Sequence, residues 1–186
     1  MPRHLTVNDL TGWKDNIQWF SAAKGNGTTE PQWQDIGNGL YGFMFTTGDE
    51  LFVTFHVNHD YALGTKGYPH IHFFSDSVEA AGESCTWEVV YTIAKGHSQG
   101  QSLTTSPATS FEMTYTYAGS EVAGEHIVLE CSDAQAFDLI EPDTVIMMGV
   151  KLVAETVTGN IFGICADLHY QSDREITPNK APDFYA

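Results

Sequence analysis

The sequence predicts an all-β fold: a single antiparallel β-sandwich of the jelly-roll type with an extended arm at each end. Eight strand-like runs follow one another along the chain, and glycine, asparagine, aspartate or proline lies in most of the joints between them. No long amphipathic helix interrupts this pattern. The 186 residues suit one domain of ordinary size, so we expect a full hydrophobic core that needs neither disulfide nor metal to fold.

Three segments place an apolar residue at every second position, which is typical of a strand buried on one face. They are residues 50–57, 86–93 and 110–117. Their apolar faces consist of Leu51, Val53, Phe55 and Val57, of Trp87, Val89, Tyr91 and Ile93, and of Phe111, Met113, Tyr115 and Tyr117. We expect these three faces to line the core.

The remaining strands are expected where other β-forming runs lie between turn residues. They are residues 40–46, 70–74, 126–130, 144–154 and 161–170. The one helix candidate, Gly12–Lys24, is short. Residues 96–110 are rich in glycine, serine, threonine and glutamine and are predicted to form a long exposed loop.

The expected strands divide the chain into an N-terminal arm over 1–37, a sandwich over 38–170 and an extended C-terminal tail over 171–186. Both ends carry aromatic residues, which either fold back over an edge of the same sandwich or lie on a neighbouring subunit. We slightly favour the second alternative and therefore expect an interface. Its residues would be Trp13, Trp19, Phe20, Trp33, Phe184 and Tyr185.

Charge and hydropathy exclude two classes of partner. The formal net charge of -16 repels phosphates, so nucleic acid is not expected as a partner. The longest apolar run, 145–154, is too short to cross a bilayer, and no basic-then-apolar leader opens the chain. Three cysteines, an odd number without a CxxC pair, are expected to be small buried side chains in a reducing compartment.

Histidines provide the sharpest local pattern. His70 and His72 are two residues apart on an expected strand, so both imidazoles project to the same side. Asp167 and His169 share a strand face in the same way. Together these four residues are candidate ligands for zinc, iron or manganese. The alternative is that they satisfy buried polar groups or line a subunit seam, and we expect no cofactor on that reading.

The segment from Gly64 to Asp76 resembles the first half of the cupin metal motif, in which two histidines are followed by an acid. The acid here is Asp76, where cupins usually have glutamate, and the second cupin motif is missing. Nucleophile elbows and phosphate loops are also missing, so the sequence favours a protein that is not an enzyme. A cupin-like metalloenzyme stays as an alternative.

Two further segments resemble small tailed-bacteriophage structural proteins, which are β-rich virion components. They are Tyr68-Pro-His-Ile-His-Phe73 and Ala166-Asp-Leu-His-Tyr-Gln171, and the tail with its Lys-x-Pro-x-Phe-Tyr end adds to the likeness. This resemblance implies a non-enzymatic part of a phage particle, made in the host cytoplasm and located in the virion. It implies as partners other capsid, neck or tail proteins.

We therefore expect a virion structural protein, most simply an oligomeric capsid decoration or a head, neck or tail accessory component. Symmetric particles favour a homo-oligomer, a trimer or a hexamer. A second alternative beside the cupin-like enzyme is a glycan-binding module of a receptor-binding fibre. It would use loop 96–110 and exposed aromatic side chains.

Overall fold

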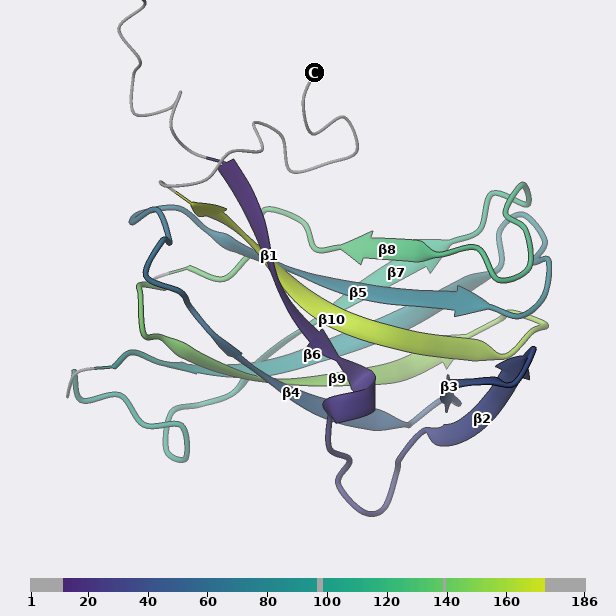
Figure 1. Cartoon of the computed structure of the whole chain (residues 1–186), viewed down its shortest axis with the longest axis horizontal. Helices are drawn as coiled ribbons and strands as arrows, with labels where there is room; N and C mark the ends of the chain where they lie inside the picture. Colours follow the sequence, from purple (N-terminus) through teal and green to yellow (C-terminus); the bar gives the residue numbers. More distant parts are fainter. Residues whose placement is uncertain (1–11, 97–98, 139, 173–186) are drawn as a thin grey trace, which may run out of the picture.

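The computed structural model describes residues 12–96, 99–138 and 140–172, and these form two packed antiparallel sheets (Figure 1). The six-stranded sheet contains β1 (Gly12–Trp19), β2 (Gln32–Gly37), β3 (Leu40–Phe45), β5 (Gly67–Ser75), β8 (Ile127–Glu130) and β10 (Ile161–Ser172). The four-stranded sheet contains β4 (Glu50–His56), β6 (Ser84–Ala94), β7 (Thr109–Thr116) and β9 (Val145–Glu155). One 3-10 turn, η2 (Phe20–Ala22), follows β1.

The strand order is that of a jelly roll. In the six-stranded sheet five strands run β2-β3-β10-β5-β8 and β1 pairs with β10 off this path, while the four-stranded sheet runs β4-β9-β6-β7. Every paired strand is antiparallel, and the chain passes repeatedly from one sheet to the other. The predicted all-β sandwich is therefore confirmed, and each of the eight expected strands is present within a few residues of its expected bounds.

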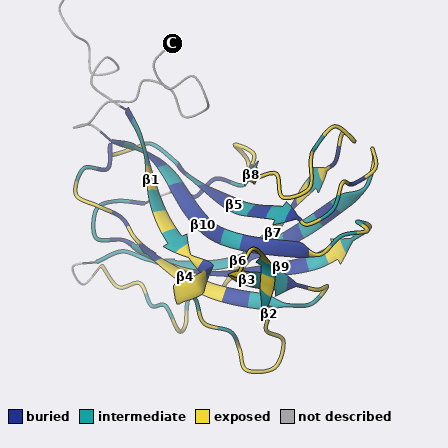
Figure 2. Ribbon diagram, turned by 45° about the vertical axis from the view of Figure 1, so that its right-hand side comes forward, coloured by how far each residue is buried: buried dark blue, intermediate teal, exposed yellow. Residues whose placement is uncertain are grey.

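The core lies between the sheets and uses the alternating faces that the sequence predicts. Phe55, Trp87 and Val89 are completely buried, and the other side chains of the three predicted faces are buried or packed against the core. Figure 2 shows the resulting alternation of buried and exposed residues along the strands. Burying one large apolar side chain contributes about 1.5–3 kcal/mol to folding, so these three strands supply much of the driving force.

Residues 12–37 differ from their predicted role. The helix expected over Gly12–Lys24 is wrong, because residues 12–19 form β1 and pair with β10 from Gly12↔Ser172 to Trp19↔Cys165. Residues 32–37 form β2, which pairs with β3. Thus two stretches of the expected arm, 12–19 and 32–37, lie in the six-stranded sheet, whereas residues 1–11 lie outside the described part of the chain.

β1 and β3 share one edge of β10. β3 pairs with residues 161–163, and β1 pairs with residues 165–172, beyond an irregularity in the register of β10. After η2 the chain crosses to the other sheet, where Lys24 exchanges two backbone hydrogen bonds with Phe52 of β4. The described part of the N-terminal segment thus covers edges of its own sandwich.

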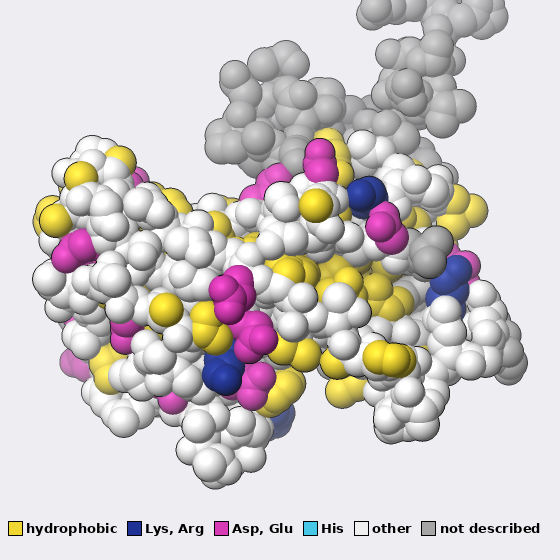
Figure 3. All heavy atoms as spheres, turned by 180° about the vertical axis from the view of Figure 1, so that it is seen from behind, with side chains coloured by type: hydrophobic (Ala, Val, Ile, Leu, Met, Phe, Trp, Pro, Cys, Tyr) yellow, Lys and Arg dark blue, Asp and Glu magenta, His cyan; other side chains and the backbone are white. Residues whose placement is uncertain are grey.

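The outer face of the four-stranded sheet carries one row of charged side chains. Its register aligns Glu50, Lys151, Glu88 and Glu112 in one row across four strands. Seen from behind the view of Figure 1, acidic side chains lie beside hydrophobic ones and a few lysines or arginines (Figure 3). No helix in the described part of the chain is long and apolar enough to cross a membrane.

Candidate functional site

Strand pairing brings the predicted histidines together on the outer face of the six-stranded sheet. In the antiparallel register of β5 and β10, His70 lies opposite Asp167, and His169 lies opposite Tyr68. Residues directly opposite each other point to the same side of a sheet, and so do residues two apart on one strand. His70, His72, Asp167 and His169 therefore share one face, while Ile71 and Leu168 between them point into the core.

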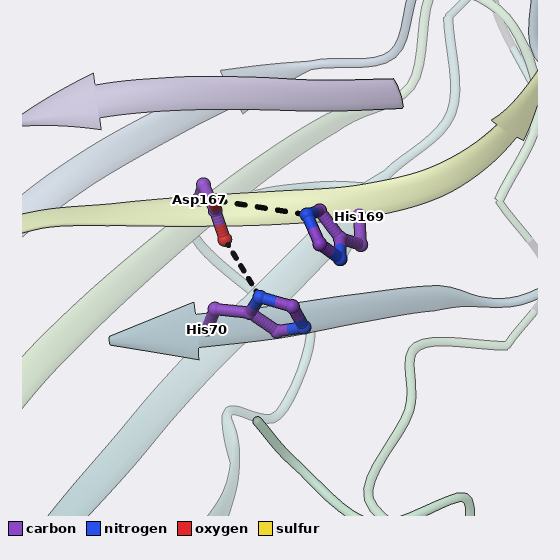
Figure 4. A group of neighbouring side chains, drawn as sticks. All are labelled: His70, Asp167 and His169. Carbon is purple, nitrogen blue, oxygen red and sulfur yellow. Dashed lines mark ion pairs between the residues drawn. The ribbon is translucent and has the colours of Figure 1, made fainter. Parts of the chain in front are cut away.

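These four side chains are in contact. His70 Nδ1 lies 3.3 Å from Asp167 Oδ1, and His72 Nε2 lies 3.0 Å from Asp167 Oδ2. His169 Nε2 lies 4.0 Å from Asp167 Oδ2, and the rings of His70 and His169 meet edge to face with centroids 3.9 Å apart. Asp167 is thus the centre of the group, and Figure 4 shows the imidazoles of His70 and His169 both turned toward it.

Three residues that the sequence analysis did not select complete the group. Glu130 of β8 accepts from His70 Nε2 at 3.0 Å, because β8 pairs with β5 in the register His70↔Glu130. His126 Nε2 lies 2.8 Å from His72 Nδ1. Asp15 of β1 contacts His169 Nε2. We call these seven residues the histidine–carboxylate cluster; they are Asp15, His70, His72, His126, Glu130, Asp167 and His169.

The centre of the cluster is shielded from water. His70 and Asp167 are each only 2% exposed. Burial lowers the pKa of His126 below the ordinary value of histidine, and the neighbouring His72 lowers it further. Charges in such a site are little screened by solvent, so their pairing matters more than at the surface.

A second group, of two histidines and one aspartate, lies elsewhere and matches the trio His70, Asp167 and His169 in composition. His56 Nε2 and His59 Nε2 lie 3.3 Å and 3.1 Å from Asp143 Oδ1. Their side chains are 55% and 73% exposed, in contrast to those of the cluster. This second group therefore sits in solvent.

An aromatic surface marks the β2–β3 end of the sandwich. Trp33 of β2 and Tyr41 of β3 are each 53% exposed, and their rings are nearly parallel, at 17° with centroids 6.3 Å apart. Phe43 meets Trp33 edge to face at 4.9 Å. We call Trp33, Tyr41 and Phe43 the aromatic platform. All three line a hollow of about 210 Å³, which Ser21 and Phe74 also help to line.

The residues expected at an interface have different environments. Trp33 and Trp19 are about half exposed, whereas Trp13 packs edge to face on Tyr68 at 5.6 Å. Phe20 is completely buried in the core, so its place at an interface is not supported. Phe184 and Tyr185 lie outside the described residues. Tyr41 was missed, because the run 40–46 indicated only a β-strand.

The cysteines offer no activated nucleophile among the described residues. Cys85, Cys131 and Cys165 are all buried. Burial raises the pKa of the Cys85 thiol to about 12, and burial together with the nearby Asp167 raises the pKa of Cys165 to about 12. A thiolate is the reactive form, so neither thiol is prepared for nucleophilic chemistry at neutral pH.

The loop predicted over 96–110 is a loop in its described part, and β7 begins at Thr109. It borders a hollow of about 250 Å³ that Gln101, Ser106 and Pro107 help to line. Tyr91, an aromatic residue at this hollow, packs against the core. Exposed aromatic rings therefore gather at the platform instead of at this loop.

No protein-family model matches the chain, and no curated protein matches it. Among solved structures the chain is similar to dimeric latent PorU from Porphyromonas gingivalis, at 13% identity over 87% of this chain and 13% of that chain, with a TM-score of 0.38. It is also similar to a family 35 carbohydrate-binding module from Clostridium thermocellum, at 10% identity over 82% of this chain and 97% of that chain, with a TM-score of 0.35. A third similar structure is CBM28, a carbohydrate-binding module specific for non-crystalline cellulose, at 16% identity over 83% of this chain and 85% of that chain, with a TM-score of 0.37. The chain spans about an eighth of PorU, and likenesses at these TM-scores assign no family.

Proposed function

We propose that this chain is a non-catalytic binding module that holds a carbohydrate on the aromatic platform. The observation that carries the proposal is the nearly parallel pair of Trp33 and Tyr41, each half exposed at the edge of a hollow of about 210 Å³. Large aromatic side chains are normally among the most buried, so a pair left in water on a rigid strand pair is typical of a binding surface.

The platform has the chemistry that a sugar ring needs. A sugar presents an apolar face of C–H groups and a rim of hydroxyls, so an aromatic ring covers the face while polar side chains bind the rim. Asp35, the partner of Tyr41 in the register, adds an acceptor beside the rings.

A glycan array probed with the full chain tests this proposal, followed by calorimetric titration with the strongest soluble oligosaccharide on the array. Trp33→Ala should weaken the affinity for that oligosaccharide at least about fivefold, since stacking on a flat aromatic surface is worth about 1–3 kcal/mol in comparable ring contacts. Tyr41→Ala should weaken it by a smaller factor, because a tyrosine ring is smaller than an indole.

Trp19→Ala is the matched control, because Trp19 is 54% exposed and lies outside the stacked pair. It should leave the affinity unchanged. An array without a hit would contradict the proposal, and so would equal losses of affinity in the Trp33 and Trp19 variants.

A structural role in a tailed-bacteriophage particle is the second candidate. It is favoured by the position of the two segments that resemble such proteins: residues 68–73 and 166–171 are neighbours on β5 and β10 and form one surface. Exposed apolar residues border that surface, namely Ile17 and Trp19 on β1 and Val128 on β8. A face of this kind suits contact with other copies or with other virion proteins.

Light scattering of the purified full chain tests the second candidate. We expect the mass of a trimer or hexamer, and Ile17→Asp should shift it toward the monomer, because a buried charge without a partner opposes association. Val122→Asp is the control, since Val122 is 64% exposed and lies outside the β5–β10 surface. A monomer at all concentrations, or the same shift in both variants, would contradict self-assembly through this face.

A further inference from the structure

The structure assigns a second binding site to this chain: we propose that His70, Asp167 and His169 bind a divalent transition-metal ion, zinc fitting best. One atom of each side chain lies within 4.8 Å of the corresponding atoms of the other two. Imidazole and carboxylate together suit zinc, iron or manganese, and zinc accepts the small tetrahedral sites that three such side chains can form.

The spacing of the ligand atoms fits a metal. Two atoms that bind the same tetrahedral ion at about 2.1 Å lie about 3.4 Å apart. His70 Nδ1 and Asp167 Oδ1 are separated by 3.3 Å, close to this value. His169 Nε2 is 4.0 Å from Asp167 Oδ2 and would need to approach by about half an ångström, using the figure above. Asp15, which contacts His169 Nε2, lies in place to supply a fourth ligand.

The hydrogen bonds of His70 require a positive ion at its Nδ1 atom, which faces Asp167. Glu130 can only accept, so it takes the hydrogen on His70 Nε2 at 3.0 Å. The lone pair of a neutral ring then lies on Nδ1 and faces a carboxylate oxygen of Asp167, which also carries lone pairs. Two lone pairs repel each other, so a positive ion between them is required: either a proton or a metal ion.

The arrangement around the three ligands is the one that metal sites use. A ligating histidine usually gives its other ring N–H to a carboxylate, which fixes its orientation, and Glu130 does this for His70. His72 donates in the same way to Asp167 Oδ2 at 3.0 Å and is itself in contact with His126. His72 and Glu130 are thus positioning residues, and the carboxylates Asp15, Glu130 and Asp167 supply the negative charge that a divalent ion would balance.

Such a site would connect strands that are distant in the sequence. β1 and β10 are separated by the whole sandwich domain along the chain, and β5 lies between them in sequence. An ion held by β5 and β10, with Asp15 of β1 beside it, would fix the edge strand β1 to the centre of the sheet. This inference does not depend on carbohydrate binding at the other end of the molecule.

The test is a calorimetric titration of the chelator-treated full chain with zinc alone, near pH 7. We expect one zinc per chain and a rise in melting temperature of about 5 °C or more at saturating zinc, because an ion that binds only the folded state stabilises it. The double variant His56→Ala/His59→Ala is the control, because it removes the exposed group of the same composition, and it should bind zinc like the unchanged protein.

Asp167→Asn and His169→Gln should each weaken zinc binding at least about tenfold, in line with the loss expected for a metal ligand or its support. Circular dichroism would show which variants stay folded. If a variant unfolds, the titration of the unchanged protein still tests the proposal. A folded wild-type chain that takes up no zinc would show that a proton occupies the cluster and would overturn the proposal. Zinc uptake lost in the His56/His59 variant would overturn it as well.

Discussion

Among the described residues, two groups of two histidines and one aspartate stand out, and they have little in common beyond composition. In the first, His56 and His59 reach Asp143 from loops and strand ends, and their side chains are more than half exposed. In the second, His70 and His169 flank Asp167 on paired strands at 12% exposure or less. The comparison teaches that residue type alone does not build a site; the sheet register and burial do.

Among substitutions that test this difference between the two groups, the largest loss of stability is expected at Asp167. Asp167→Asn keeps the size of the side chain but removes the charge that His70 and His72 face. Breaking a buried ion pair on one side leaves the partner uncompensated, so we expect the free energy of unfolding to fall by about 3 kcal/mol at neutral pH without added metal. Urea denaturation measures this. A loss below about 1 kcal/mol, as for a surface pair, would mean that the cluster is not effectively buried.

Glu79 can be compared with Asp167, because it is also a buried carboxylate. Its hydrogen-bond partners are hydroxyl and backbone groups instead of imidazoles. It is 1% exposed and connects the segment after β5 to the turn before β10. Burial raises its pKa, but hydrogen bonds from Ser75 and from the Thr158 and Gly159 backbone outweigh this and lower the pKa to about 2.

Glu79→Gln should therefore lower the free energy of unfolding by about 2 kcal/mol at neutral pH. A lowered pKa means that the folded state favours the ionised form, so this contribution is complete above the ordinary pKa near 4.5 and is lost as the pH falls toward 2. Urea denaturation of both proteins across this range should show their difference in stability shrinking. A difference independent of pH would contradict the assigned role of the carboxylate.

The smallest effect is expected in the exposed group. Asp143→Asn should change the free energy of unfolding by less than about 1 kcal/mol, because ion pairs in solvent contribute little. Asparagine is chosen because Asp143 has a φ of 65°, which asparagine tolerates well. Urea denaturation of this variant and of the Asp167 variant measures both changes in the free energy of unfolding. Equal losses would contradict the claim that only one of the two groups is buried.

The core could be predicted well from the sequence. A strand that is buried on one face needs apolar residues at every second position, and this pattern is visible within a single segment. The faces built on Phe55, Trp87 and Met113 follow directly from period-two patterning. β1 was not predicted, since its mixed residues became a strand only through pairing with β10. Strand order was also out of reach, because alternation is the same in any sandwich.

The candidate site could be predicted only in part for the same reason. His70 with His72, and Asp167 with His169, are neighbours within single strands, so each pair was visible in the sequence. That Glu130 meets His70 depends on the pairing of β5 with β8, which lie far apart in the chain. Asp15 joins through β1, the strand that was misassigned. The platform was missed because Trp33 and Tyr41 meet only through the β2–β3 register.

Diffraction from crystals soaked in zinc, recorded on both sides of the zinc absorption edge, tests the central claim most directly. The claim is that strand register, and not mere composition, makes one of the two histidine groups a cation site. We predict a single anomalous peak bonded to His70 Nδ1, Asp167 and His169. A peak at His56, His59 and Asp143 with none between β5 and β10 would contradict it.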